Sequence, residues 1–164
     1  MEYLYAPWRS EYITEESKPK GCVFCNISSH SEDDEKLHVL FRDDLCFIIM
    51  NRYPYTPGHF MIIPHIHTDS LETLPPEIWL RMSRYAQQGV DMLKNGFGAE
   101  GVNIGMNLGA AAGAGIAEHI HLHLVPRFSR DNNFITTIGY TRVYSVDFNK
   151  IYEKLRSMSR KYFK

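Results

Sequence analysis

Three histidines alternate with aliphatic residues in the segment EHIHLHLVPR, residues 118–127. Successive side chains of a β-strand point to opposite faces, so His119, His121 and His123 would share one face and the aliphatic residues the other. The aliphatic face is expected to be core. This stretch therefore predicts a strand with one apolar face and one face rich in imidazole.

The remaining patterns predict further strands and two helices. HVLFRDDLCFIIMN and HFMIIP read as two strands of an antiparallel hairpin, joined by the wide loop NRYPYTPG. Residues 75–95 place apolar side chains at helical spacing and end at the pair Asn95-Gly96, and a second amphipathic helix begins near Phe148. GVNIGMNLG is expected to be a strand that enters the small-residue loop GAAAGAG. Strands followed by helices and more strands indicate an α+β domain built on an antiparallel sheet.

Composition limits the classes of partner. A chain of 164 residues, 44% hydrophobic and 23% charged, suits one compact domain. The formal net charge is -1 and no Lys/Arg run is present, so we expect no nucleic-acid partner and local binding of any anion. The N-terminus has acids and aromatics where a signal peptide would be apolar, and no apolar run approaches the roughly 20 residues of a membrane span. We therefore expect a cytoplasmic protein with no membrane partner.

Three histidines in register can be a solvated polar edge, a metal site or a catalytic group. A rise of about 3.3 Å per residue puts His119 and His123 on the order of 13 Å apart, so one ion held by all three is awkward, although adjacent pairs could chelate. The favoured interpretation is that the central imidazole, that of His121, is the reacting group. Its neighbours would then orient it, donate protons or bind structural metal. A neutral imidazole can attack phosphorus near neutral pH, because its pKa is about 6.5.

The loop NLGAAAGAGIAE, before the histidines, is rich in glycine and alanine. Such residues let backbone N–H groups approach an anion and form a phosphate-binding concavity, although small residues also serve tight packing. Arg127 lies just beyond the histidines and could contact phosphate. A plain surface charge is the favoured interpretation of Arg127.

Two of the three cysteines lie close together in CVFC, as Cys22 and Cys25. An odd cysteine count argues against a disulfide framework and for a reduced compartment. Tetrahedral zinc needs four ligands and Cys46 is the only other cysteine, so histidines would have to complete a site presented from a tight turn. The alternative is a pair of buried free thiols.

HIHLHLV resembles the histidine-triad signature of the HIT superfamily. FIIMNRYPYTPGHFMIIPHIH is similar to the N-terminal half of that family, while LYAPWRSEYI, CVFC and AEHIHLHLVPRFSRDNNF resemble the bacterial branch that includes diadenosine tetraphosphate phosphorylases. The similarity runs from about Leu4 to Tyr144. It implies one HIT domain over residues 1–164, with an antiparallel sheet, a long helix packed on it and a C-terminal helix. Its expected parts are an N-terminal extension with a CxxC zinc knuckle (1–35), a HIT core (36–140) and the C-terminal helix (141–164).

The resemblance implies nucleotidyl transfer through a covalent histidine. His121 would attack the α-phosphorus of a mono- or dinucleoside polyphosphate, and a second acceptor, phosphate or water, would then remove the nucleotidyl group. Relatives often carry glutamine or serine where this chain has Gly115, so one side-chain donor to the phosphate is missing here. The expected supporting roles are orientation or polarisation by His123 and His59, a ribose contact by Asn51, lining of the phosphate pocket by Asn107, and backbone anion contacts from Gly113, Gly115 and Ile116.

The resemblance also implies a closed, structural zinc site and a homodimer. His67 and His119 would join Cys22 and Cys25 as ligands, with His65 as the nearby competitor of His67. Three other functions stay open at this point. They are a HIT-family nucleotide-binding module, a nucleoside phosphoramidate or dinucleoside polyphosphate hydrolase without phosphorolysis, and a catalytic zinc held by His119 and His121 that activates water.

Overall fold

The computed structural model describes residues 21–129, 131, 134–140 and 146–164. Its sheet has the strand order β1-β2-β3-β5-β4, and all four neighbouring pairs are antiparallel. This confirms the expected α+β class. LYAPWRSEYI lies outside the described residues. The strands are β1 Val39–Arg42, β2 Cys46–Met50, β3 Phe60–Pro64, β4 Gly101–Gly105 and β5 Leu122–Arg127.

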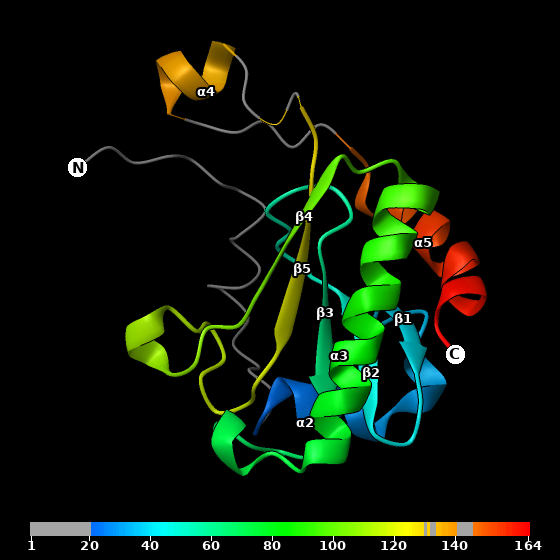
Figure 1. The fold of residues 1–164 in the computed structure, drawn as a ribbon, viewed down its shortest axis with the longest axis vertical. Helices are drawn as coiled ribbons and strands as arrows, with labels where there is room; N and C mark the ends of the chain where they lie inside the picture. The colour runs from blue at the N-terminus through cyan, green and yellow to red at the C-terminus, as the bar shows by residue number, and fades with distance from the viewer. Residues whose placement is uncertain (1–20, 130, 132–133, 141–145) are drawn as a thin grey trace.

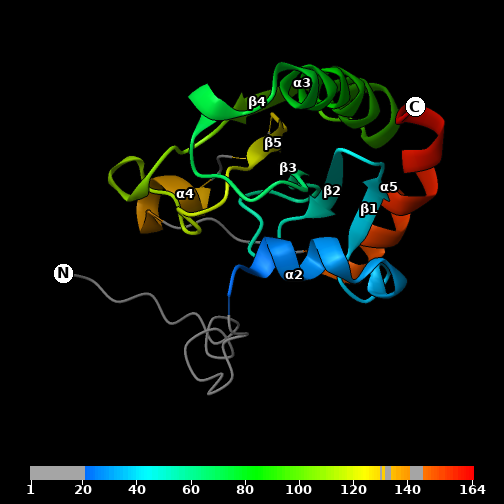
Figure 2. The ribbon, with the colours of Figure 1, turned by 90° about the horizontal axis from the view of Figure 1, so that it is seen from below.

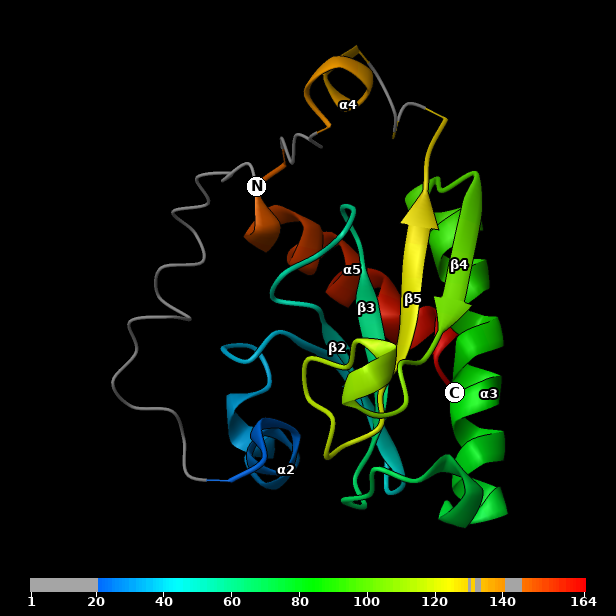
Figure 3. The same cartoon turned by 90° about the vertical axis from the view of Figure 1, so that its left-hand side faces the viewer.

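Helices cover both faces of this sheet. The long helix α3 (Pro76–Asp91) and the C-terminal helix α5 (Phe148–Tyr162) lie on one side, and α2 (Val23–Ser29) lies on the other (Figures 1 and 2). The short helix α4 (Phe134–Gly139) stands apart from the sheet (Figure 3). Among the described helices, none combines the length and the apolarity needed to cross a membrane. The remaining elements are the 3-10 turns Ser31–Asp33, Leu71–Thr73 and Ala110–Ala112 and the π-helix η4, Met92–Phe97.

The core has two layers because strand side chains alternate between faces. Phe60 and Ile62 belong to the large cluster under α3 and α5, whereas Met61 and Ile63 belong to the smaller cluster under α2. His123 pairs with Met61 across the sheet and therefore faces α2. Helix α2 thus covers this face at the buried His119 and His121, and the face is not a solvated edge there.

The first long strand expected from the sequence is two strands. HVLFRDDLCFIIMN breaks at Asp43, whose side chain accepts hydrogen bonds from the backbone N–H groups of Leu45 (2.9 Å) and Cys46 (2.8 Å). Asp side chains that capture nearby N–H groups favour turns. The chain therefore reverses between β1 and β2, and the predicted hairpin with its wide loop is formed by β2 and β3.

Other predicted boundaries also shift. The central helix does not stop at Asn95-Gly96 but continues as the π-helix to Phe97 and ends at Gly98, whose φ is +89°. Glycine suits that left-handed position because it has no Cβ. The strand predicted over GVNIGMNLG ends at Gly105, and the strand predicted to begin at the histidines begins at Leu122.

The cysteine motif also differs from its prediction. CVFC is not a tight turn but the start of α2, with Cys22 as the N-cap and Cys25 in the first turn.

Candidate active site and metal site

His121 is buried, 6% exposed, in the extended segment just before β5. Its Nδ1 lies 2.8 Å from the backbone oxygen of His119. A carbonyl oxygen can only accept, so Nδ1 carries the proton and donates it. In the neutral ring this leaves the lone pair on Nε2. The segment is also held by the Ile120 N–H, which donates to the Thr68 carbonyl at 2.8 Å. His121 therefore presents its unprotonated Nε2 in one orientation.

A second chain of hydrogen bonds sets the tautomers of His59 and His123. The backbone N–H of Tyr55 donates to His59 Nδ1 at 3.2 Å, so the proton of the neutral His59 ring is on Nε2. That Nε2–H donates to His123 Nδ1 at 2.9 Å. His123 must then carry its own proton on Nε2, and its ring lies 4.9 Å from that of His121, centroid to centroid. His121 thus offers a lone pair on Nε2, and the neighbouring His123 offers an Nε2–H donor.

Both supporting imidazoles are neutral at neutral pH. Burial, followed by the nearby His123 and His121, lowers the pKa of His59 to about 3. Burial and then His121 lower the pKa of His123 to about 4. A neutral His59 keeps its Nδ1 free to accept from Tyr55. The hydrogen-bond chain therefore persists through the physiological pH range.

The loop between β2 and β3 holds His59 in place through two contacts. The buried hydroxyl of Thr56 donates to the Pro126 carbonyl at 2.7 Å, which ties the loop to the end of β5. Gly58 has φ +89°, and a Cβ there would come within 2.7 Å of the Phe97 ring. The Pro-Gly-His sequence is thus explained locally, since only glycine fits this conformation and contact.

Asn51 and Asn107 occupy different surroundings. Asn51 follows β2, its Oδ1 accepts from the Tyr53 backbone N–H at 2.9 Å, and its Nδ2 lies 3.4 Å from His59 Nε2. Asn107 lines an open pocket of about 320 Å³ beside His123 and Tyr55. Neither Asn51 nor residues 113–116 are among the lining residues, which are Tyr55, Asn103, Ile104, Gly105, Met106, Asn107, His123 and Val125.

The glycine-rich loop before the histidines is exposed and roomy. Gly113 has φ +90°, and a Cβ at Gly113 or Gly115 would meet nothing within 4 Å. Ile116 anchors the far end of the loop, because its partly buried side chain packs on the cluster under α2. The structure fits the interpretation of Arg127 as a surface charge. Its guanidinium donates to Asp131 (2.7 Å) and to Asn103 (2.9 Å).

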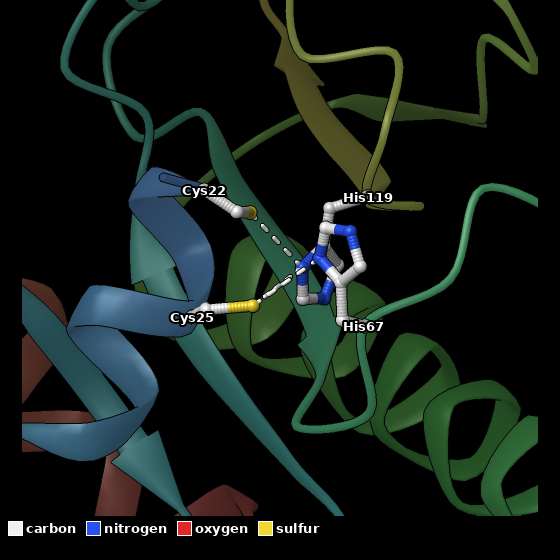
Figure 4. A group of neighbouring side chains, drawn as sticks. All are labelled: Cys22, Cys25, His67 and His119. Carbon is white, nitrogen blue, oxygen red and sulfur yellow. Dashed lines mark hydrogen bonds between the residues drawn. The ribbon is translucent and has the colours of Figure 1, made fainter. Parts of the chain in front are cut away.

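Two cysteines and two histidines converge on one another, and one of them is His119, the first histidine of the triad (Figure 4). The potential ligand atoms of Cys22, Cys25, His67 and His119 all lie within 4.8 Å of one another. Tetrahedral zinc with bonds of about 2.0–2.3 Å needs ligand separations of roughly 3.3–3.8 Å, so a small contraction would complete the site. His121 is not in this cluster, and the alternative of a catalytic zinc held by His119 and His121 receives no support from the described residues.

His119 already has the tautomer of a ligand. Its Nε2 lies 2.9 Å from the Pro64 carbonyl and must donate, which leaves the lone pair of Nδ1 facing Cys22 Sγ at 3.3 Å and Cys25 Sγ at 3.7 Å. Burial is also the main cause that lowers the pKa of His119. Such a carbonyl partner on the second ring nitrogen is typical of metal-binding histidines.

His67, not His65, belongs to the cluster. His67 Nδ1 lies 3.2 Å from Cys25 Sγ. The ring of His65 is engaged elsewhere: Nδ1 contacts the Ser28 hydroxyl at 2.7 Å and Nε2 donates to the Asp43 carbonyl at 2.9 Å. The described geometry therefore separates two histidines that the sequence left as competitors.

Comparison with known proteins identifies the family. The HIT domain matches residues 32–130, more than half of the chain. The chain belongs to the HIT family. The AP-4-A phosphorylase of Mycobacterium tuberculosis is 35% identical over 151 residues, 87% of this chain and 76% of the relative. The adenylylsulfatase HINT3 of Arabidopsis thaliana is 36% identical over 110 residues, 67% of this chain and 54% of the relative. Such relatives indicate a nucleotide-processing enzyme.

A solved structure of a zinc-bound histidine triad family protein from Mycobacterium smegmatis is similar to this HIT chain. Its TM-score is 0.69 and its sequence identity 31%, with 86% of this chain and 94% of that chain covered. The HIT fold expected from the sequence is therefore confirmed. The zinc named for that relative agrees in kind with the two-cysteine, two-histidine cluster described here.

Sequence reasoning missed two residues that contact the HIT triad. Phe24, 4% exposed in α2, packs its ring 5.3 Å from that of His121. Tyr55 supplies the backbone N–H that sets the His59 tautomer, and its half-exposed ring lies 4.6 Å from His59. The position of Phe24 inside CVFC could have flagged it. Nothing in the sequence pattern distinguished Tyr55.

Proposed function

We propose that this HIT protein transfers a nucleotidyl group from a dinucleoside polyphosphate to phosphate through a covalent bond to His121. The observation that carries the proposal is the tautomer of His121. With Nδ1–H donated to the His119 carbonyl at 2.8 Å, Nε2 keeps its lone pair and needs no separate base. The 35% identity to an AP-4-A phosphorylase supports diadenosine tetraphosphate as the substrate.

The reaction would be two displacements at the same phosphorus. In the first, His121 Nε2 attacks the α-phosphorus, and the departing ATP takes the bonding electrons of the broken anhydride. In the second, a phosphate oxygen attacks the nucleotidyl phosphorus, and ADP leaves while the lone pair returns to Nε2. His123 would donate its Nε2–H to the charge that develops on the phosphate oxygens.

The remaining predicted residues would hold the substrate. We assign the ribose contact to Asn51 and a phosphate contact to Asn107, which lines the pocket beside His123. Backbone N–H groups of Gly113, Gly115 and Ile116 would bind phosphate, because exposed small residues allow close approach. Gly115 contributes no side-chain donor. Because this donor is missing, we expect the transfer of the nucleotidyl group from His121 to phosphate to be slower. Water would therefore remove part of the nucleotidyl group, which is hydrolysis.

We also propose that Cys22, Cys25, His67 and His119 bind zinc. The donor set suits the ion, since soft thiolates and imidazoles are its usual ligands and four of them close the coordination sphere. When bound, the metal would supply structure and no open position for water. The lone pair on His119 Nδ1 and the zinc-bound relative support this assignment.

The test is product analysis on diadenosine tetraphosphate with phosphate varied at fixed substrate. Chromatography should give ADP and ATP in millimolar phosphate and slow formation of AMP and ATP without phosphate. Formation of AMP in place of ADP at every phosphate concentration would make the protein a hydrolase. Binding without any product would leave a nucleotide-binding module.

A further inference from the structure

The helix that carries the two cysteines also touches the central histidine of the triad. Phe24 stands between Cys22 and Cys25 in α2 and is 4% exposed. Its ring lies edge-on to His119 at 5.5 Å and tilted against His121 at 5.3 Å. A movement of either cysteine therefore moves a ring that supports the proposed nucleophile.

His119 provides a second connection. Its Nδ1 faces both cysteine sulfurs, and its backbone oxygen accepts the Nδ1–H of His121 at 2.8 Å. The same residue thus joins the sulfur cluster to the hydrogen bond that sets the His121 tautomer. Two independent contacts, through Phe24 and through His119, couple the cysteine pair to one imidazole.

The cysteines of this pair differ from Cys46 in accessibility. Cys22 and Cys25 are half-buried free thiols, and His67 beside them is exposed. Cys46 is 0% exposed in the core, and burial raises the pKa of its thiol. Solvent-borne oxidants therefore reach the paired cysteines and not the third, and the reactive form of any thiol is the thiolate, which zinc binding maintains.

We propose that Cys22 and Cys25 are an oxidation site through which a peroxide switches off His121. One thiolate attacks the peroxide, the O–O bond breaks, and a sulfenic acid and hydroxide form. The second thiolate attacks the sulfenic sulfur and expels a second hydroxide, forming the S–S bond. The two sulfurs lose two electrons, the peroxide becomes two waters after taking up two protons, and the zinc ion is released. This inference rests on the proposed zinc site and on the proposed role of His121.

Disulfide formation would disturb both connections. An S–S bond of about 2.05 Å draws the sulfurs together and away from His119 and His67. The backbone on each side of Phe24 must adjust, and the His119 ring loses its partner on Nδ1. A shift of His119 that follows this loss would weaken the hydrogen bond from His121 Nδ1–H to the His119 carbonyl. The tautomer with the lone pair on Nε2 would then be less strongly favoured.

The experiment titrates the zinc-loaded, full-length chain with hydrogen peroxide and follows four readouts. They are zinc release to a coloured chelator, the Cys22–Cys25 disulfide by peptide mass, the ring nitrogens of His121 by long-range ¹H–¹⁵N NMR, and turnover of diadenosine tetraphosphate. Zinc release, the disulfide and a change in the His121 nitrogen shifts should appear together, while turnover falls at least tenfold. Dithiothreitol with added zinc should restore all four.

Cys46→Ala is the matched control and should respond to peroxide as the wild type does. Unchanged His121 shifts and turnover after complete disulfide formation would overturn the coupling. Zinc retained with both thiols intact at peroxide levels that oxidise a free cysteine peptide would overturn the oxidation site. If the reduced protein turns over no nucleotide, the proposed function fails, whereas the NMR shifts still decide this inference.

Discussion

At the scale of single residues, the site depends on which ring nitrogen carries the proton in His59, His119 and His121. Carbonyl oxygens of Pro64 and His119 can only accept, and the backbone N–H of Tyr55 can only donate. These groups place the lone pair of His119 on Nδ1 and that of His121 on Nε2. The same residue type, repeated at every second position, therefore takes on distinct chemical roles.

Replacement of His121 tests the proposed nucleophile. We expect His121→Ala to abolish turnover while the protein stays folded and binds nucleotide with an affinity within about threefold of wild type, because binding comes from ribose and phosphate contacts. Steady-state kinetics, thermal unfolding and equilibrium binding check the three parts. A rate near that of wild type would sink the covalent mechanism.

The two loop glycines make a matched pair of substitutions. Gly115→Ser should change the free energy of unfolding by less than about 0.5 kcal/mol, because a Cβ there meets nothing within 4 Å. Gly113→Ser should cost about 1 kcal/mol, since φ at Gly113 is +90°. If the added hydroxyl binds phosphate, Gly115→Ser should also lower the KM for phosphate by up to about tenfold. Equal destabilisation by both changes, measured in urea, would contradict this explanation.

The buried His59 and the half-buried His123 predict acid sensitivity. The folded pKa values of about 3 for His59 and about 4 for His123 lie below the unfolded value of about 6.5. Each group therefore contributes stability above pH 6.5 that is lost as pH falls towards its folded pKa, because the unfolded chain binds more protons there.

Urea unfolding at pH 7 and pH 5 measures this loss. Wild type should be less stable at pH 5, and His123→Asn should lose about 1–2 kcal/mol less than wild type between the two pH values. Any loss of zinc in acid would affect wild type and His123→Asn alike. The difference between their pH dependences therefore reports the protonation of His123. Identical pH dependence in the two proteins would show that His123 is not neutralised by burial.

At the scale of elements, helix α2 closes the histidine face of the sheet. Phe24 and Ile27 add its apolar side to the cluster of β2 and β3 residues, while its first turn brings two sulfurs to His67 and His119. A seven-residue helix is too short to be stable alone. We therefore expect metal binding to contribute strongly to its docking.

His67→Gln and His65→Gln test that expectation on neighbouring residues. His67→Gln should lose zinc and lower Tm by roughly 10 °C, corresponding to a few kcal/mol for a chain of this size. His65→Gln should keep one zinc per chain, because His65 contacts Ser28 and Asp43 and not the cluster. Elemental analysis and calorimetry give both quantities. Zinc loss in His65→Gln with retention in His67→Gln would reverse the assignment.

At the scale of the whole molecule, β4 is an edge strand of the described sheet, and its Ile104 side chain is 50% exposed. An apolar edge strand is a site for pairing with another chain. Together with the homodimer that the family resemblance implies, this makes β4 the expected contact between two chains. The homodimer itself remains a prediction.

A charge on this edge tests the dimer. Ile104→Lys should shift the mass measured by light scattering from that of two chains towards that of one, because a buried lysine at a two-fold contact is unpaired. Ile138→Lys on α4 is the matched control at a residue 65% exposed and should leave the mass unchanged. Dissociation by Ile138→Lys alone would place the contact on α4 instead.

Much of the fold could be read from local patterns. Alternation placed the apolar face of β5 correctly, the apolar run HFMIIP located β3, and helical spacing located α3 and α5. Boundaries failed where a single side chain or a glycine decided the chain direction, as at Asp43 and Gly98. Such decisions depend on individual hydrogen bonds and φ angles, which periodicity does not encode.

The identities of the site residues were available in the sequence, because histidine, cysteine and glycine limit the chemistry wherever they lie. Their roles required the tertiary structure. Pro64 and Phe24 act on histidines that are distant in sequence, through a carbonyl and a ring. Tyr55 sets the tautomer of the nearby His59 through a backbone N–H group. His65 and His67 are separated only by which atoms surround them. Residue type sets what a side chain can do, whereas burial and the partners of its polar atoms decide which of those things it does.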